Sequence, residues 1–173
     1  MVLVLAAGLG CGAAWAQDRP APLPLRDVDV SYRIQAGTQA IEQRSRFSFA
    51  GQRMRVDMPT PGVYSIMDYR SHVMSFVVEG DRASLDTPMP PPVSPAYQRV
   101  GPDQVAGLPC TEWQTVDPQK QAVVFCFTDD GVMLRVRRGM QPVAVATRVS
   151  FGPQDPALFA VPAGFQHVTR QGR

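Results

Sequence analysis

Histidine and lysine are nearly absent from this chain, and cysteine is scarce. Among 173 residues there are two histidines, one lysine and three cysteines. Catalytic and metal-bound sites are usually built from clusters of histidine, cysteine and carboxylate side chains, and no such cluster stands at ligand spacing here. The serines lie outside any nucleophile-elbow motif, and Asp129-Asp130-Gly131 has the composition of a turn. We therefore expect no enzyme, no catalytic residue, no such metal centre and no cofactor.

The chain also lacks a concentrated basic segment and any long helical pattern. Its formal net charge is +2 and its basic residues are scattered, which argues against a nucleic-acid partner. Seventeen prolines and fourteen glycines indicate many turns and little long helix. A hydrophobic content of 45% with 18% charged residues is typical of a globular domain with its own core.

The first residues have the pattern of a secretory signal peptide. An apolar run at 2–9 precedes Ala14-Trp15-Ala16, a small-x-small cleavage pattern, so the predicted signal is 1–16. The run is too short to span a bilayer. Export to the periplasm, or secretion, is the expected destination. An anchored lipoprotein acylated at Cys11 is the alternative.

Two regions follow the predicted signal. Residues 17–26 carry three prolines and are expected to form an extended, poorly ordered leader, and 27–173 to form a single β domain. The cysteines that remain after cleavage are Cys110 and Cys126. An even number of cysteines in an exported chain favours a structural disulfide between them.

Most of the remaining chain alternates between apolar and polar residues. Within 27–34, Val28, Val30, Tyr32 and Ile34 share one face, and charged or polar residues share the other. This period of two predicts half-buried strands. By the same criterion, with turn residues between them, strands are predicted at 40–50, 53–58, 63–67, 73–78 and 82–86.

Residues 105–138 predict a three-stranded meander with turns at 117–120 and 129–131. If the first turn centres on Pro118, Cys110 lies directly opposite Cys126, which is close enough for a disulfide. Closing a loop of about 17 residues would contribute roughly 3 kcal/mol in the chain-entropy model. A two-residue second turn at Asp130-Gly131 pairs apolar residues across the next hairpin and leaves Cys126 and Arg135 on the other face. The expected pairs are Phe127 with Leu134 and Phe125 with Val136.

The rest of the chain is more irregular. Five prolines make 87–95 a crossover loop, and 96–100 is expected to form a helical turn. A further strand is predicted at 143–151, a helical turn at 156–159 and brief pairing at 165–169. The predicted fold is therefore mainly β. It is a curved antiparallel sheet or half-open β-barrel of about ten strands, with one or two short helical turns.

Several motifs carry a resemblance to a known architecture. They include Gly51-Gln-Arg-Met-Arg-Val-Asp-Met58, Ile66-Met-Asp68, Val105-Ala-Gly-Leu-Pro-Cys110-Thr-Glu-Trp113, Cys126-Phe-Thr-Asp-Asp-Gly-Val-Met-Leu-Arg135 and Gly152-Pro-Gln-Asp-Pro-Ala-Leu-Phe-Ala-Val-Pro-Ala-Gly164. With these, the chain is similar to a group of uncharacterised exported bacterial proteins. It resembles the periplasmic lipoprotein-carrier (LolA/LolB-like) superfamily over most of 27–168. The resemblance implies a half-open antiparallel barrel with an apolar concave face, but carries over no ligand-contacting residue.

A set of apolar residues predicted to face inward has two interpretations. They could line a cavity for a lipid or a lipoprotein acyl chain, because methionine and phenylalanine adapt to variable apolar ligands. They could equally form an ordinary filled core. The cavity candidates are Phe47, Phe49, Met54, Val56, Met58, Ile66, Met74 and Phe76.

Two other functions remain open. The chain could be a structural or interaction module of the cell envelope, contacting a partner through the 88–95 loop or a basic hairpin. That hairpin, made of Arg44, Arg46, Arg53 and Arg55, is either a solvated sheet face or a peripheral contact for anionic lipid headgroups. Less favoured is a copper-binding protein, because thioethers suit Cu(I). Its candidate ligands are Met54, Met58, Met67, Met74, Met89 and His72.

Overall fold

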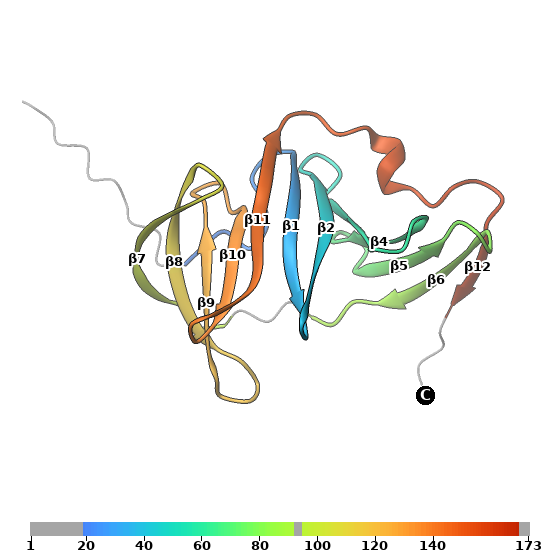
Figure 1. Ribbon diagram of the computed structural model, residues 1–173. Coiled ribbons are helices and arrows are strands. Elements are labelled where there is room, and N and C mark those ends of the chain that lie inside the picture. Colours follow the sequence, from blue (N-terminus) through green and yellow to red (C-terminus); the bar gives the residue numbers. More distant parts are fainter. Residues whose placement is uncertain (1–18, 92–94, 170–173) are drawn as a thin grey trace, which may run out of the picture.

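A computed structural model describes residues 19–91 and 95–169, and shows one sheet of twelve strands with a single 3-10 turn (Figure 1). The predicted cleavage site, Cys11 and the middle of the proline-rich loop lie outside the described residues. The elements are β1 Val28–Ala36, β2 Gln39–Ser48, β3 Arg53–Asp57, β4 Val63–Asp68, β5 Val73–Val78, β6 Ala83–Pro88, β7 Gln98–Val105, β8 Leu108–Val116, β9 Ala122–Phe127, β10 Met133–Arg138, β11 Gln141–Phe151, η1 Pro156–Phe159 and β12 Gln166–Thr169.

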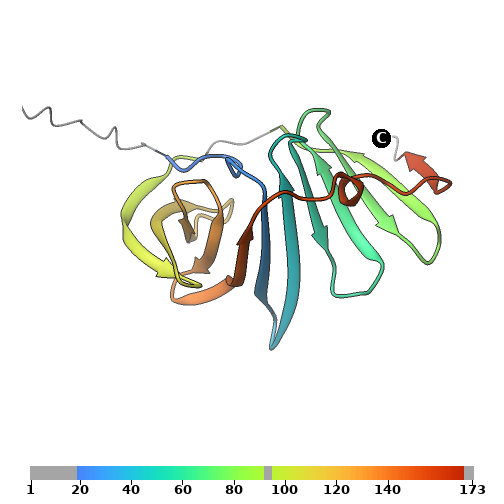
Figure 2. The same ribbon diagram turned by 90° about the horizontal axis from the view of Figure 1, so that it is seen from above.

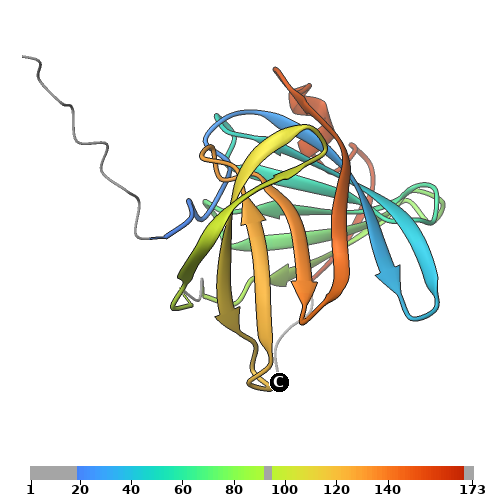
Figure 3. The ribbon, with the colours of Figure 1, turned by 60° about the vertical axis from the view of Figure 1, so that its left-hand side comes forward.

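The sheet has two wings that meet at β1. One wing runs β2 to β6 through consecutive antiparallel hairpins, and the other runs β11 back to β7. Strand β1 pairs with β2 on one side and with β11 on the other, so it joins the two wings into one sheet. Strand β12 pairs in parallel along the edge of β6, whereas the other strand pairs of the described residues are antiparallel. Strands of the two wings cross at a steep angle (Figure 3), as expected when the twist of many strands accumulates.

The β7–β11 wing is rolled up, whereas the β2–β6 wing is more open (Figure 2). Arg135 of β10 contacts Asp103 of β7, although β8 and β9 lie between these strands. In a flat sheet three strand spacings amount to about 14 Å. The contact therefore shows that the β7–β11 wing curls toward the face that carries these two side chains. The mainly β, curved-sheet prediction is confirmed.

The disulfide forms, but in a different register from the one predicted. Cys110 and Cys126 are bonded with their Cα atoms 5.5 Å apart, while the residue directly opposite Cys126 is Glu112. The predicted register is wrong by two residues because the turn runs from Asp117 to Gln121, with the Asp117 carboxylate accepting from the Gln121 amide. Lys120 takes a positive φ of 60° to close this longer loop. Side-chain direction has a period of two, so both cysteines still share a face.

The second hairpin follows the predicted register only in part. Phe125 pairs with Val136 as expected, but Phe127 pairs with Met133 because a bulge lies between Met133 and Arg135. Leu134, at this bulge, is fully buried in the same cluster as Cys126. The disulfide face, predicted to lie opposite the apolar face of this hairpin, is thus also a core face of the rolled wing.

Two strands are additional to the predicted ten. The segment expected to form a helical turn at 96–100 instead begins β7, which pairs with β8 through a bulge between Arg99 and Gly101. Pro102 is tolerated because β7 is an edge strand, where a missing amide donor costs no ladder hydrogen bond. The brief pairing expected near the C-terminus is β12. The turn at 156–159 is η1, as predicted, with Asp155 as its N-cap.

Residues 19–26 are packed rather than poorly ordered. Leu23 contacts the main core, and the Leu25 amide donates to the Asp130 carbonyl oxygen at 2.9 Å. Gly131 has a φ of +76°, and a Cβ atom there would lie 2.7 Å from the Leu23 carbonyl oxygen. A glycine is therefore required for residues 19–26 to lie against the β9–β10 turn.

Residues 152–165 form a strap that runs from β11 across the β2–β6 wing to β12 (Figure 2). Val161 and Phe165 of the strap pack against Tyr64, Ile66 and Val77 in a second buried cluster. One face of the wing is thereby covered by the chain itself. Across 19–91 and 95–169 we find no helix with the length and apolar character needed to cross a membrane.

Candidate functional site

The sheet around β1 to β5 has two distinct faces, because side chains alternate along each strand. Residues paired across neighbouring strands share a face, as Val30, Ser45 and Val56 do. We call this side the pocket face. The side of Tyr64 and Ile66, which the strap covers, is the strap face.

The pocket face contains a hollow of about 340 Å³. Its floor comes from β1, β2, β3 and β11, and its walls from the N-terminal segment, the β4–β5 turn and the tip of the β9–β10 hairpin. The described lining residues are all uncharged: Pro22, Leu23, Pro24, Val28, Val30, Tyr32, Ile34, Gln43, Ser45, Phe47, Met54, Val56, Tyr69, Phe127, Gly131, Val132, Met133 and Ala144. Such a volume and lining suit a small apolar ligand.

Few polar groups reach this hollow. The Tyr32 hydroxyl donates to the Met133 carbonyl oxygen at 2.7 Å, and burial raises the pKa of Tyr32 well above its usual value. Burial also raises the pKa of Tyr69. Both phenols therefore stay neutral at any physiological pH. Gln43 and Ser45, which lie on β2, supply the other side-chain polar atoms of the lining. The hollow can hold an apolar chain and a few neutral hydrogen-bonding groups, and its described lining offers no charge to a ligand.

Three of the eight cavity candidates line this hollow, namely Phe47, Met54 and Val56. Met58 lies beside it, with its sulfur 3.9 Å from Nε2 of Gln43. Met74 and Phe76 share the pocket face further along the wing, because they pair with Met67 and Ser65. Two candidates lie elsewhere: Phe49 is exposed at the end of β2, and Ile66 is buried on the strap face.

The walls of the hollow carry no sequence pattern that predicts them. Tyr69, the 131–133 segment and residues 22–24 belong to turns or to the N-terminal segment, where no alternation marks a buried side. The floor residues Val28, Val30, Tyr32 and Ile34 were detectable, since their strict alternation already placed them on one face.

The basic hairpin is not a free cationic patch. Arg46 is 8% exposed and pairs with Asp57, which also accepts from Arg55 at 2.7 Å. Arg53 and Arg55 donate to carbonyl oxygens of the strap, at Phe159 and Leu158. These arginines hold the strap against the sheet, and Arg44 pairs with Asp29.

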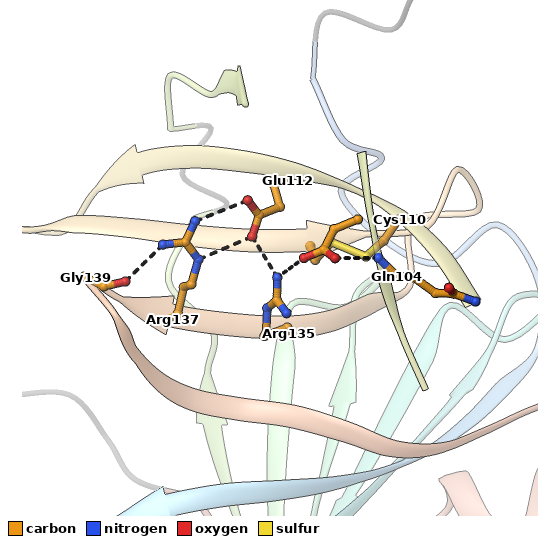
Figure 4. A network of polar contacts seen from close by, with 8 residues as sticks. Gln104, Cys110, Glu112, Arg135, Arg137 and Gly139 are labelled. Carbon is orange, nitrogen blue, oxygen red and sulfur yellow. Dashed lines mark hydrogen bonds and ion pairs between the residues drawn. A yellow bond between two sulfur atoms is a disulfide. The ribbon is translucent and has the colours of Figure 1, made fainter. Parts of the chain in front are cut away.

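A second charged network lies beside the disulfide (Figure 4). Arg135 donates to Asp103 and, at 2.8 Å, to Glu112, which also accepts from Arg137. Hydrogen bonding from Arg137, and then from Arg135, holds the pKa of Glu112 below its usual value against the opposing effect of burial. The Gln104 amide, and then Arg135, lower the pKa of Asp103 in the same way. The network ties β7, β8 and β10 together.

Replacing Glu112 by glutamine should make the protein less sensitive to acid. A carboxyl group whose pKa is depressed by folding stabilises the protein above its unfolded pKa, and loses that contribution as the pH falls through its folded pKa. At pH 7 the variant should therefore be about 1.5–3 kcal/mol less stable to unfolding than the wild type. At pH 3 the difference in unfolding free energy between variant and wild type should be much smaller. Urea unfolding at both values measures this. Asp81→Asn, at an exposed position, is the control. An equal loss at both pH values would contradict the role of the network.

Sequence comparisons give no relative for this chain. No protein-family model matches it, and no curated protein matches it. Its strands and turns are nevertheless shared with solved structures at the level of fold.

Three such structures illustrate the likeness. An uncharacterised conserved protein from Thermus thermophilus has a TM-score of 0.64 at 11% identity, covering 84% of this chain and 91% of that one. PNGF-II has a TM-score of 0.55 at 11% identity, covering 84% of this chain and 31% of its own. MucB, solved in complex with MucA(peri), has a TM-score of 0.54 at 15% identity, covering 83% of this chain and 57% of its own. At 11–15% identity, these likenesses concern the fold alone.

Proposed function

We propose that this chain is a non-enzymatic, lipoprotein-carrier-like protein that holds an apolar ligand, such as a lipid acyl chain, in the hollow of its pocket face. The observation that supports this most directly is an uncharged, mostly apolar hollow of about 340 Å³. A filled core would leave no such space, since protein interiors pack without voids much larger than a water molecule.

The lining favours an unbranched apolar chain. Met54 and Met133 are flexible, while Phe47 and Phe127 offer flat surfaces, and together they can adapt to chains of different length. Burying about eight CH₂ groups would contribute roughly 6 kcal/mol. This gross gain supports weak, reversible binding of the kind a carrier uses.

The proposed compartment, the periplasm, is consistent with this function. The Cys110–Cys126 disulfide is stable in oxidising surroundings such as the periplasm and is rare in reducing cytosol. The fold-level likeness to MucB and the signal-like pattern of 1–16 point the same way. The proposed site of action is therefore the periplasm.

Filling the hollow should abolish ligand binding. Ser45 lies on its floor between Val30 and Val56, so Ser45→Phe places an aromatic ring in the space an acyl chain would occupy. Native mass spectrometry after incubation with a bacterial lipid extract should show bound lipid on the wild type and none on the variant.

The matched control is Ser31→Phe, on the neighbouring strand. Ser31 pairs with Arg44 and its side chain points to the opposite face, so this variant should bind lipid as the wild type does. Absence of lipid from the wild type, or equal binding by Ser45→Phe, would reject the proposal.

A protein contact is the second candidate. Phe76, on the pocket face beyond the hollow, is 37% exposed, and the MucB structure was solved with MucA(peri). An envelope protein could cover this part of the face. Photocrosslinking from position 76, with position 79 of the neighbouring turn as control, should then capture one defined partner. Crosslinks of equal yield from both positions would count against it.

A further inference from the structure

Three methionines form a row across the pocket face. Met54 of β3 pairs directly with Met67 of β4, and Met67 pairs directly with Met74 of β5. We call these three residues the methionine row. Directly opposed residues of an antiparallel sheet have Cβ atoms about 4.5–5.5 Å apart. Three thioethers on neighbouring strands can therefore converge on one point without any backbone movement.

Two of the three sulfur atoms already lie near one group. The Tyr69 hydroxyl lies 3.8 Å from the Met54 sulfur and 3.9 Å from the Met67 sulfur. All three methionines are half-buried, so the row is both shielded and reachable from solvent. Met54 and Tyr69 also line the hollow, which places the row at its edge.

Sequence spacing alone does not reveal this arrangement. The intervals between the three methionines follow from the lengths of two hairpins, and only the register brings the residues side by side. Met58 lies outside the row, with its sulfur 3.9 Å from Nε2 of Gln43. The backbone amide of Met89 donates to the carbonyl oxygen of His72 at 2.8 Å, which continues the β5–β6 pairing one step past Val73 and Pro88.

We propose that the methionine row binds a soft monovalent cation, Cu(I), through the sulfurs of Met54, Met67 and Met74. Thioethers are neutral, soft ligands that select Cu(I) over the hard and borderline divalent ions. Both cysteines of the described domain are joined in a disulfide, so they do not compete as thiolates. No oxidation or reduction is involved, because the metal only exchanges solvent or buffer ligands for sulfur. Cu(I) binding at the row does not depend on the acyl-chain function, although the row shares Met54 with the lining of the hollow.

Titration with Cu(I) tests the assignment. The purified full chain, carrying Cys11→Ser in every variant to remove its remaining thiol, is titrated anaerobically in ascorbate against a chromophoric Cu(I) chelator. One equivalent should bind. Mutating residues that only hydrogen-bond to metal ligands typically costs about 10–100-fold in metal affinity. Removing the ligands themselves, in Met54→Leu/Met67→Leu/Met74→Leu, should therefore weaken Cu(I) binding by roughly 100-fold or more. Met140→Leu, at a position that is 90% exposed, should leave it unchanged.

Two further readouts make the test decisive. Leucine conserves size and apolar character, and Met67 and Met74 stand outside the described lining of the hollow. Met67→Leu/Met74→Leu should therefore weaken Cu(I) binding but still bind lipid in native mass spectrometry, which separates failure of this site from failure of the proposed function. Met67→Leu alone, which removes only the central sulfur, serves if the triple variant does not fold. Methyl-¹³C-methionine spectra with Ag(I) as a redox-inert probe should move the Met54, Met67 and Met74 signals together. Unchanged Cu(I) affinity in Met67→Leu, or Ag(I) shifts confined to other methionines, would overturn the assignment.

Discussion

Replacing Asp57 by alanine should lower the free energy of unfolding by about 3–5 kcal/mol, because it leaves guanidinium groups buried without their partner. The Asp57 carboxylate accepts from both Arg46 and Arg55, whose side chains are only 10% and 15% exposed. Nε of Arg46 is already buried, with no hydrogen-bond partner among the described residues. Burial lowers the pKa of Arg46, and the charge of Asp57 opposes this effect most strongly. Urea unfolding of the variant measures the loss.

A second substitution identifies the cause of that loss. Arg46→Met in the Asp57→Ala background should recover part of the stability, since an apolar side chain of similar length removes the unpaired charge. The exposed pair Arg33–Glu42, with side chains 65% and 62% exposed, is the control, and Glu42→Ala should cost less than about 1 kcal/mol. If the double variant were as unstable as Asp57→Ala, or less stable, buried charge would not be the reason.

Loss of the disulfide should cost roughly 2–4 kcal/mol and leave the fold unchanged. The bond joins residues 16 positions apart and ties β8 to β9, and closing such a loop in the unfolded chain accounts for about 3 kcal/mol. Cys110→Ala should show this loss in urea unfolding. Because both sulfurs are buried, part of the cost in that variant comes from lost packing.

Reductant separates the crosslink from the packing. Reducing the wild type breaks the bond but keeps both side chains, so its unfolding midpoint should fall with added dithiothreitol. Cys110→Ala should not respond to the same treatment. Identical wild-type midpoints with and without reductant would show that the bond contributes nothing to stability.

Local alternation was sufficient to predict much of the sheet. Val28 to Ile34 alternate strictly, and they form β1 with their apolar side on the pocket face. The 63–68 strand was harder to orient, because it is apolar on both sides. Met67 pairs with Met54 on the pocket face, so Ile66 turns to the strap face, where Val161 and Phe165 cover it. Alternation gives the period of a strand, and the distant strap determines which side is the core.

The remaining differences have similar physical origins. Lys120 adopts a positive φ and lengthens the turn, which moves the disulfide register by two residues. A bulge at Leu134 turns that residue toward the cysteines. Leu23 and Gly131 meet across more than a hundred residues to close the hollow. Each feature depends on one unusual backbone angle or one long-range contact, and neither leaves a periodic pattern in the sequence.

Methyl-¹³C-methionine spectra recorded during titration with a medium-chain fatty acid test the central claim most directly. Met54 and Met133 both line the hollow, from β3 and from β10, while Met140 is 90% exposed. If an apolar chain enters the hollow, the Met54 and Met133 methyl signals should shift together and saturate, and the Met140 signal should stay in place. Signals from Met54 and Met133 that do not move at saturating ligand, or a shift confined to Met140, would contradict the account.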